Sequence, residues 1–83
     1  MKEDMPQEMS AQEMFEELGY VFEINDNFIE YYKNSKRSFF VYKYVCFDLV
    51  GKSYSASCNY ENMEIDMPTF RAIYKQLEEL GWL

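Results

Sequence analysis

Hydrophobic residues between Ala11 and Leu18 recur every three to four positions, which is the spacing of an amphipathic helix. Ser10 stands just before this segment and Glu13 three residues later, the pattern of a capping box in which each side chain accepts a hydrogen bond from the other residue's backbone N–H. Gly19 follows as a helix stop. The pattern therefore predicts a short helix that begins after Ser10 and ends at Leu18.

A different pattern runs from Tyr20 to Cys58, where Val, Ile, Tyr and Phe are dense and turn-forming residues recur at short intervals. It predicts four strands, at Tyr20–Ile24, Phe28–Lys33, Phe39–Leu49 and Tyr54–Cys58. The third run is long, and its apolar parity switches between Tyr44 and Val45. This switch indicates either a β-bulge near Tyr44 or an aromatic-rich outer face that is left exposed.

The C-terminal part of the chain returns to helical spacing. Asp66 can cap a helix, and Pro68 then occupies its second position, where a missing N–H is tolerated. Gly81 ends the helix. The predicted buried stripe is Phe70, Ile73, Leu77 and Leu80.

These elements predict a single α+β domain over residues 10–83, preceded by a flexible acidic arm at residues 1–9. A short N-terminal helix, a four-stranded antiparallel meander and a C-terminal amphipathic helix follow one another. We expect both helices on one sheet face, because each apolar surface needs a cover. The expected core consists of Phe15, Leu18, Phe22, Ile29, Val45, Phe47, Tyr54, Phe70, Ile73, Leu77 and Leu80.

The two cysteines lie on the last predicted hairpin, and strand parity predicts their relation. If Val50-Gly51 form the turn, Cys46 faces Ser55 and Cys58 faces Lys43 on the neighbouring strand. The two thiols then point to opposite sides of the sheet, where no disulfide can form. We expect two reduced cysteines and a cytoplasmic protein.

Composition excludes most chemistries. The chain has no histidine, so a Ser/His/Asp triad, a Cys/His pair and a His-ligated metal site are impossible. No other nucleophile–base pair or ligand set can be assembled, and we expect no enzyme activity, no cofactor and no bound metal. No apolar run reaches the roughly 18 residues of a membrane span. The net charge of −7 favours basic partners over nucleic acid or anionic lipid.

Two local motifs imitate functional sites. The segment Gly51–Ser53 resembles the end of a phosphate-binding P-loop, but Cys46 stands where that motif needs its first glycine, and the segment belongs to a hairpin turn. Three carboxylates cluster after the last strand without the alternation or central glycine of a calcium loop, so they predict a solvated acidic loop and a helix cap. These are Glu61, Glu64 and Asp66.

Acidic residues form the first candidate binding surface. Glu13 and Glu17 lie one helical turn apart with Glu16 beside them. Carboxylates at this spacing can imitate a row of phosphates and occupy the basic groove of a host protein, although an ordinary solvated helix face has the same pattern. The predicted surface comprises Glu13, Glu16, Glu17, Glu23, Asp26 and Glu30.

Basic residues, interleaved with aromatics, are concentrated in the middle of the chain and form the alternative. Such a stretch is typical of a surface that stacks single-stranded nucleic acid, and it is equally typical of a sheet whose lysines prevent edge-to-edge aggregation. Its residues are Lys33, Lys36, Arg37, Lys43 and Lys52, with Tyr42 and Tyr44. A third hypothesis is a homodimer in which the spare aromatic faces of two copies pair.

Two segments share the form hydrophobic-Glu-Glu-Leu-Gly-aromatic, at Phe15–Tyr20 and Leu77–Trp82. Two helices that end alike account for this echo, and a duplicated half is the alternative. The order of elements, above all Phe15–Tyr20 and Ala72–Trp82, resembles small accessory proteins encoded by phages and prophages of Gram-positive bacteria, over residues 10–83. The resemblance implies a protein that binds and blocks a host protein, such as an RNA-guided nuclease or another defence enzyme, in an anti-CRISPR-like manner.

Overall fold

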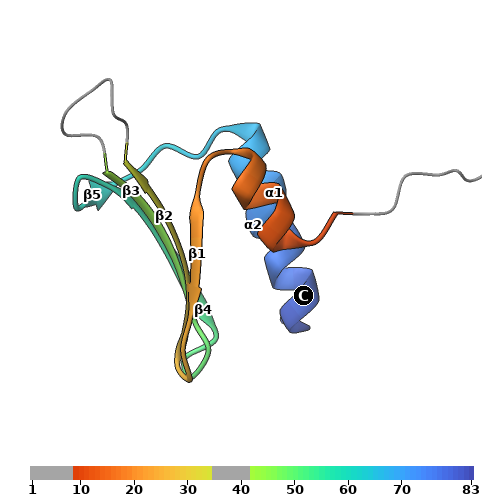
Figure 1. Cartoon of the computed structure of the whole chain (residues 1–83). Helices are drawn as coiled ribbons and strands as arrows, with labels where there is room; N and C mark the ends of the chain where they lie inside the picture. The colour runs from red at the N-terminus through yellow and green to blue at the C-terminus, as the bar shows by residue number, and fades with distance from the viewer. Residues whose placement is uncertain (1–8, 35–41) are drawn as a thin grey trace, which may run out of the picture.

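The computed structural model of the chain describes residues 9–34 and 42–83. Its elements are α1 (Ala11–Glu17), β1 (Val21–Ile24), β2 (Phe28–Asn34), β3 (Tyr42–Asp48), β4 (Ser53–Cys58), β5 (Glu61–Asn62) and α2 (Met67–Leu80). The strands form one antiparallel sheet in the order β1-β2-β3-β4-β5, and both helices cover the same face of it (Figure 1). The predicted α+β architecture is confirmed. A short fifth strand, β5, lies where the sequence predicted only an acidic loop.

Both helices begin at the predicted caps. The Ser10 hydroxyl accepts a hydrogen bond from the Glu13 N–H at 3.1 Å, and the Ser10 N–H donates to the Glu13 carboxylate at 2.9 Å. This is the complete capping box. The Asp66 carboxylate caps α2 by accepting from the Thr69 N–H at 2.9 Å.

The two helices also end in the same way. The Tyr20 N–H donates to the Phe15 carbonyl at 3.0 Å, and the Trp82 N–H donates to the Leu77 carbonyl at 3.1 Å. Gly19 and Gly81 adopt φ values of +96° and +75°, which other residues rarely adopt. Both ends therefore have the Schellman geometry, and this shared helix end accounts for the internal sequence echo.

The register between β3 and β4 is the predicted one. Cys46 pairs with Ser55, and Lys43 pairs with Cys58, so the two cysteines point to opposite faces and are free thiols. The connection is longer than the predicted two residues, since β3 ends at Asp48 and β4 begins at Ser53. The Asp48 carboxylate stabilises this longer loop by accepting from two loop N–H groups, each at 3.0 Å.

The expected bulge in the third strand is absent from the described residues. Every residue from Lys43 to Asp48 pairs in unbroken register with both neighbouring strands, and Tyr42 pairs with Asn34 of β2. The alternative interpretation is correct: Val45 and Phe47 are buried under the helices, while Tyr42 and Tyr44 alternate to the outer face. The predicted strand residues 39–41 lie outside the described residues.

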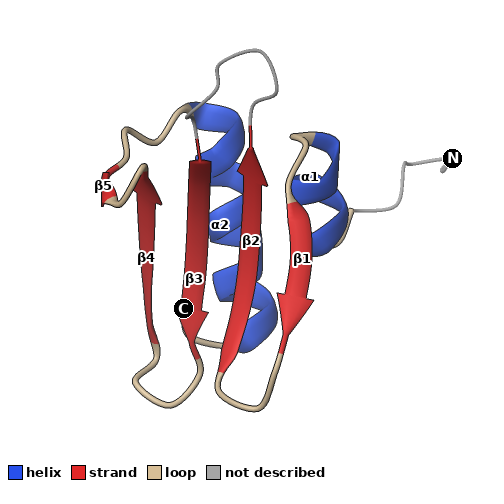
Figure 2. Cartoon of the chain, turned by 60° about the vertical axis from the view of Figure 1, so that its left-hand side comes forward, coloured by secondary structure: helices blue, strands red, loops and turns tan. Residues whose placement is uncertain are grey.

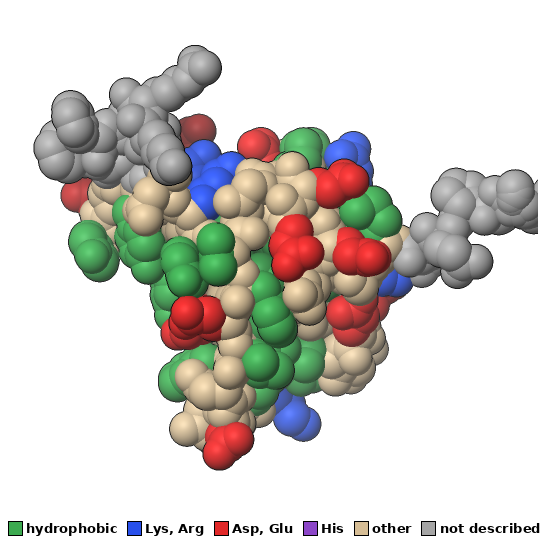
Figure 3. Space-filling model, in the orientation of Figure 1, with side chains coloured by type: hydrophobic (Ala, Val, Ile, Leu, Met, Phe, Trp, Pro, Cys, Tyr) green, Lys and Arg blue, Asp and Glu red, His purple; other side chains and the backbone are tan. Residues whose placement is uncertain are grey.

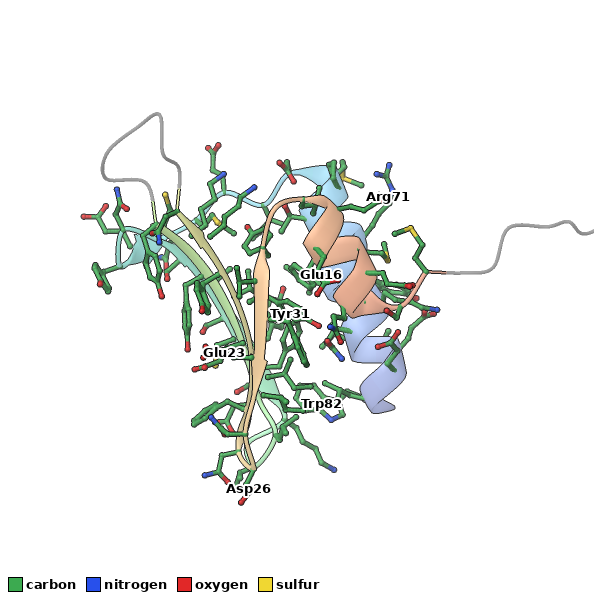
Figure 4. All side chains as sticks on the ribbon, in the orientation of Figure 1. Glu16, Glu23, Asp26, Tyr31, Arg71 and Trp82 are labelled. Carbon is green, nitrogen blue, oxygen red and sulfur yellow. The ribbon has the colours of Figure 1, made fainter. Side chains whose placement is uncertain are left out.

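Tyr31 occupies the centre of the core and points from β2 toward the helices (Figure 4). Its ring stacks on Phe15 at a centroid distance of 3.8 Å and meets Phe47 edge-on at 6.1 Å. Its hydroxyl donates to the Oε1 atom of buried Gln76 at 2.6 Å. Burial raises the pKa of Tyr31, which keeps this donor protonated. The buried core consists of Phe15, Tyr20, Ile29, Tyr31, Val45, Phe47, Ala72 and Ile73.

The prediction of the core is wrong for two residues. Tyr54 and Phe70 are each 45% exposed. Helix α2 turns Thr69, Ala72, Ile73 and Gln76 inward, so Phe70 falls on its outer side. Viewed from the outer face in Figure 2, α2 lies behind β2 and β3 and leaves β4 without a helix cover, which exposes Tyr54. The other predicted core residues are buried or pack against the buried cluster.

We expect Tyr31→Phe to destabilise the fold by about 1–3 kcal/mol, because it leaves the buried Gln76 oxygen without its donor. Urea unfolding measures this loss. The double variant Tyr31→Phe/Gln76→Leu removes both polar partners and should lose less than the two single variants added together. A Tyr31→Phe loss below about 0.5 kcal/mol would contradict this role for the hydrogen bond.

Phe47→Ala and Phe70→Ala test the orientation of α2 together. Phe47 is completely buried, and its truncation should cost about 3 kcal/mol. Phe70 lies on the outer side of α2, so its truncation should cost less than about 1 kcal/mol. Equal losses in urea unfolding would show that both rings belong to the core.

The cap of α2 predicts a dependence of stability on pH. Hydrogen bonds from Thr69 hold the pKa of Asp66 below its ordinary value. Because the folded-state pKa is the lower one, the carboxylate stabilises the fold above its unfolded pKa, and this contribution disappears as the pH falls through the folded pKa. Thermal unfolding between neutral pH and about pH 3 should therefore show a smaller acid-induced loss in Asp66→Asn, which caps without titrating.

Candidate functional site

The six acidic candidate residues, which we call the acidic side, lie at the β1 end of the sheet but in three separate places on both of its faces. Glu13, Glu16 and Glu17 project from α1 in the helix layer, and Asp26 lies in the turn between β1 and β2. Glu23 and Glu30 lie on the outer face of the sheet, on β1 and β2. Figure 4 shows Glu16 and Glu23 on opposite sides of β1, and Figure 3 shows acidic side chains spread over this side with apolar ones between them.

The carboxylates of α1 are not equivalent. Glu13 is committed to the capping box, where its oxygen accepts from the Ser10 N–H. Glu16 accepts from the Gln12 side chain at 3.2 Å, and both Glu16 and Glu17 are exposed. The helix therefore presents two carboxylates to a partner, and the third has a structural role.

Glu23 and Glu30 face one another directly across the β1–β2 pair. Like charges in this position destabilise a sheet, so the fold alone does not favour the pair. Each carboxylate has a tyrosine donor: the Tyr32 hydroxyl lies 3.2 Å from Glu23, and the Tyr44 hydroxyl lies 2.5 Å from Glu30. These bonds hold both carboxylates in place without neutralising their charge.

The tyrosines remain neutral donors. Burial, and then the hydrogen bond to Glu30, raises the pKa of Tyr44. The hydrogen bond to Glu23 likewise raises the pKa of Tyr32. The phenols therefore stay protonated around neutral pH, and the charge on this face comes from the carboxylates.

Tyr42 lies at the centre of a group of four tyrosines on the same face, because its ring contacts the rings of the other three. Its ring centroid lies 6.4 Å from that of Tyr32, 6.2 Å from that of Tyr44 and 5.9 Å from that of Tyr60. We call the surface made by these four rings with Glu23 and Glu30 the tyrosine face. Tyr32 and Tyr60 were not among the predicted site residues, although the shared parity of Tyr32 and Glu30 in one strand was a usable signal.

The structure does not bring the described basic residues to the tyrosine face. Lys33 and Lys43 have the opposite parity, on the helix-covered side of the sheet. The Lys33 ammonium donates to the Leu18 carbonyl at 2.6 Å and lies 4.8 Å from the centre of the Tyr20 ring. Lys52 belongs to the loop between β3 and β4. Lys36 and Arg37 lie outside the described residues.

Comparison with protein-family models, with curated proteins and with solved structures gives no match for this chain. Within residues 9–34 and 42–83, no three His, Cys, Asp or Glu side chains are grouped so that they could hold a metal ion. In the same ranges, neither helix has the length and apolar character needed to cross a membrane.

Proposed function

We propose that the chain is a non-enzymatic binding protein whose acidic side receives a basic surface of a partner protein. The observation that carries this proposal is the direct opposition of Glu23 and Glu30 on the tyrosine face. A basic partner would convert this unfavourable pair into two favourable contacts, since each carboxylate keeps its charge and its position.

Electrostatics supports a basic partner at longer range as well. Among the described residues, the outer face of the sheet carries no lysine or arginine, and α1 adds the exposed Glu16 and Glu17. The net charge of −7 attracts a positive surface before contact. Such association is strongest at low salt and weakens as the Debye length shortens.

The resemblance to phage accessory proteins extends the proposal to a class of partner. A host nucleic-acid-handling or defence protein has a basic groove for phosphates, and carboxylates in its path would block it. The placement of Lys33 and Lys43 toward the helices gives the alternative, a single-stranded nucleic-acid binder, less support than the acidic side receives.

Charge reversal at matched positions tests the proposal. Glu16→Lys/Glu17→Lys and Glu23→Lys/Asp26→Lys each raise the net charge by the same amount as the control Glu64→Lys/Glu78→Lys, whose positions lie between β5 and α2 and on α2. A partner captured from bacterial lysate by the tagged chain is purified and titrated by calorimetry. We expect at least about tenfold weaker binding for one or both acidic-side variants, and little change for the control.

Salt and mass measurements complete this experiment. Binding of the unaltered chain should weaken markedly above an ionic strength of about 0.15 M. Light scattering on the chain alone first measures whether two copies pair. Equal binding by all three variants would contradict the acidic-side mechanism, and binding of a single-stranded oligonucleotide by the unaltered chain would favour the alternative.

A further inference from the structure

The turn between β4 and β5 has an unusual backbone for its sequence. Cys58 pairs with Glu61, and the two residues between them, Asn59 and Tyr60, have φ values of 53° and 70°. Two positive φ values define a type I′ hairpin turn, in which asparagine suits the first position and glycine the second. A tyrosine at the second position is strained.

Burial of Tyr60 does not compensate for this strain, because the residue is 88% exposed. The turn is nevertheless fixed. The Asn59 N–H donates to the Tyr42 carbonyl at 2.8 Å, and the Tyr42 N–H donates to the Asn59 side-chain oxygen at 2.7 Å. These two bonds tie the turn to β3 and hold Tyr60 beside Tyr42.

Tyr60 lines a hollow of about 480 Å³ on the tyrosine face. Strand β3 contributes Tyr42 and Tyr44 to its lining, and β4 contributes Ser55 and Ser57. The hydroxyls of Ser55 and Ser57 can each accept a hydrogen bond from a ligand. The hollow therefore combines aromatic ring surfaces with hydrogen-bond acceptors.

The charges around this hollow favour a cation. The Tyr44 hydroxyl donates to the Glu30 carboxylate, which polarises the phenol and makes its ring face more negative. Glu23 lies across from Glu30 on the same face, without any described basic side chain there. A phosphate group would meet these carboxylates, whereas a cation is attracted to both the rings and the acids.

We propose that this hollow, which we call the tyrosine pocket, binds an arginine side chain of a partner protein. The proposal rests on the proposed function, since the arginine belongs to the basic surface that the acidic side receives. A guanidinium is planar and stacks on tyrosine rings, and its N–H groups suit the two serine hydroxyls, whereas a lysine ammonium lacks the planar surface. The strained turn then places Tyr60 where it supplies one of the stacking rings.

Tyr60→Gly separates binding from stability. The change creates Asn-Gly, the preferred type I′ pair, so the unfolding temperature should stay the same or rise. Binding of the capped tripeptide Gly-Arg-Gly should weaken at least about fivefold, measured from the NMR shifts of Ser55, Ser57 and Tyr42 during titration. Tyr74→Ala removes a half-exposed tyrosine from α2, away from the pocket, and serves as the control that leaves binding unchanged.

Further titrations decide the chemistry of the pocket. The unaltered chain should bind Gly-Arg-Gly more tightly than Gly-Lys-Gly, and more tightly than the uncharged citrulline analogue. The proposal is overturned if Tyr60→Gly binds Gly-Arg-Gly as the unaltered chain does, or if only a single-stranded oligonucleotide shifts the pocket residues. If the pocket binds Gly-Arg-Gly but the acidic-side variants bind the partner as tightly as the unaltered chain does, the proposed function is overturned. The proposal of an arginine-binding pocket then still holds.

Discussion

The packing of Tyr31 is the contact on which the rest of the structure depends. One side chain from β2 stacks on Phe15 of α1, meets Phe47 of β3 edge-on and donates its hydroxyl to Gln76 of α2. The short helix α1 has only seven residues and would be marginal alone, so its position follows from this aromatic contact. The buried hydrogen bond to Gln76 favours the rotation of α2 that turns this residue, with Ala72 and Ile73, toward the sheet.

The local elements could be predicted because their signals are local. The capping box at Ser10, the Asp66 cap and the two helix ends need only neighbouring residues, and the hairpin register needs only strand parity. The core residues could not all be predicted from hydrophobicity alone. Tyr31 was missed because a buried tyrosine needs a polar partner, and Gln76 is forty-five positions away. Phe70 was misplaced because α2 packs through Ala72 and Gln76, a choice that hydrophobic spacing does not reveal.

The sequence predicted which acidic residues belong to the candidate site, but it did not predict how they are arranged. The acidic excess identified Glu23 and Glu30, but their direct opposition follows from the register of the first hairpin. The basic candidates were grouped by closeness in sequence, whereas parity places Lys33 and Lys43 with the buried Tyr31 and Val45 on the helix-covered side. Hydrophobic periodicity did not point to Tyr60, because this residue lies in a turn. The same turn brings Tyr60 beside Tyr42.

Residue placements that are locally unfavourable occur mainly on one face of the sheet. On the helix-covered face the aromatic rings interlock and the buried Tyr31 hydroxyl has its partner, so sequence and structure agree. The outer face holds two acids in direct opposition, and its end carries a tyrosine in a left-handed conformation at high exposure. Neither feature stabilises the free chain. Because unfavourable local features persist where function requires them, their concentration on the outer face supports the proposal that a partner contacts this face beside the exposed carboxylates of α1.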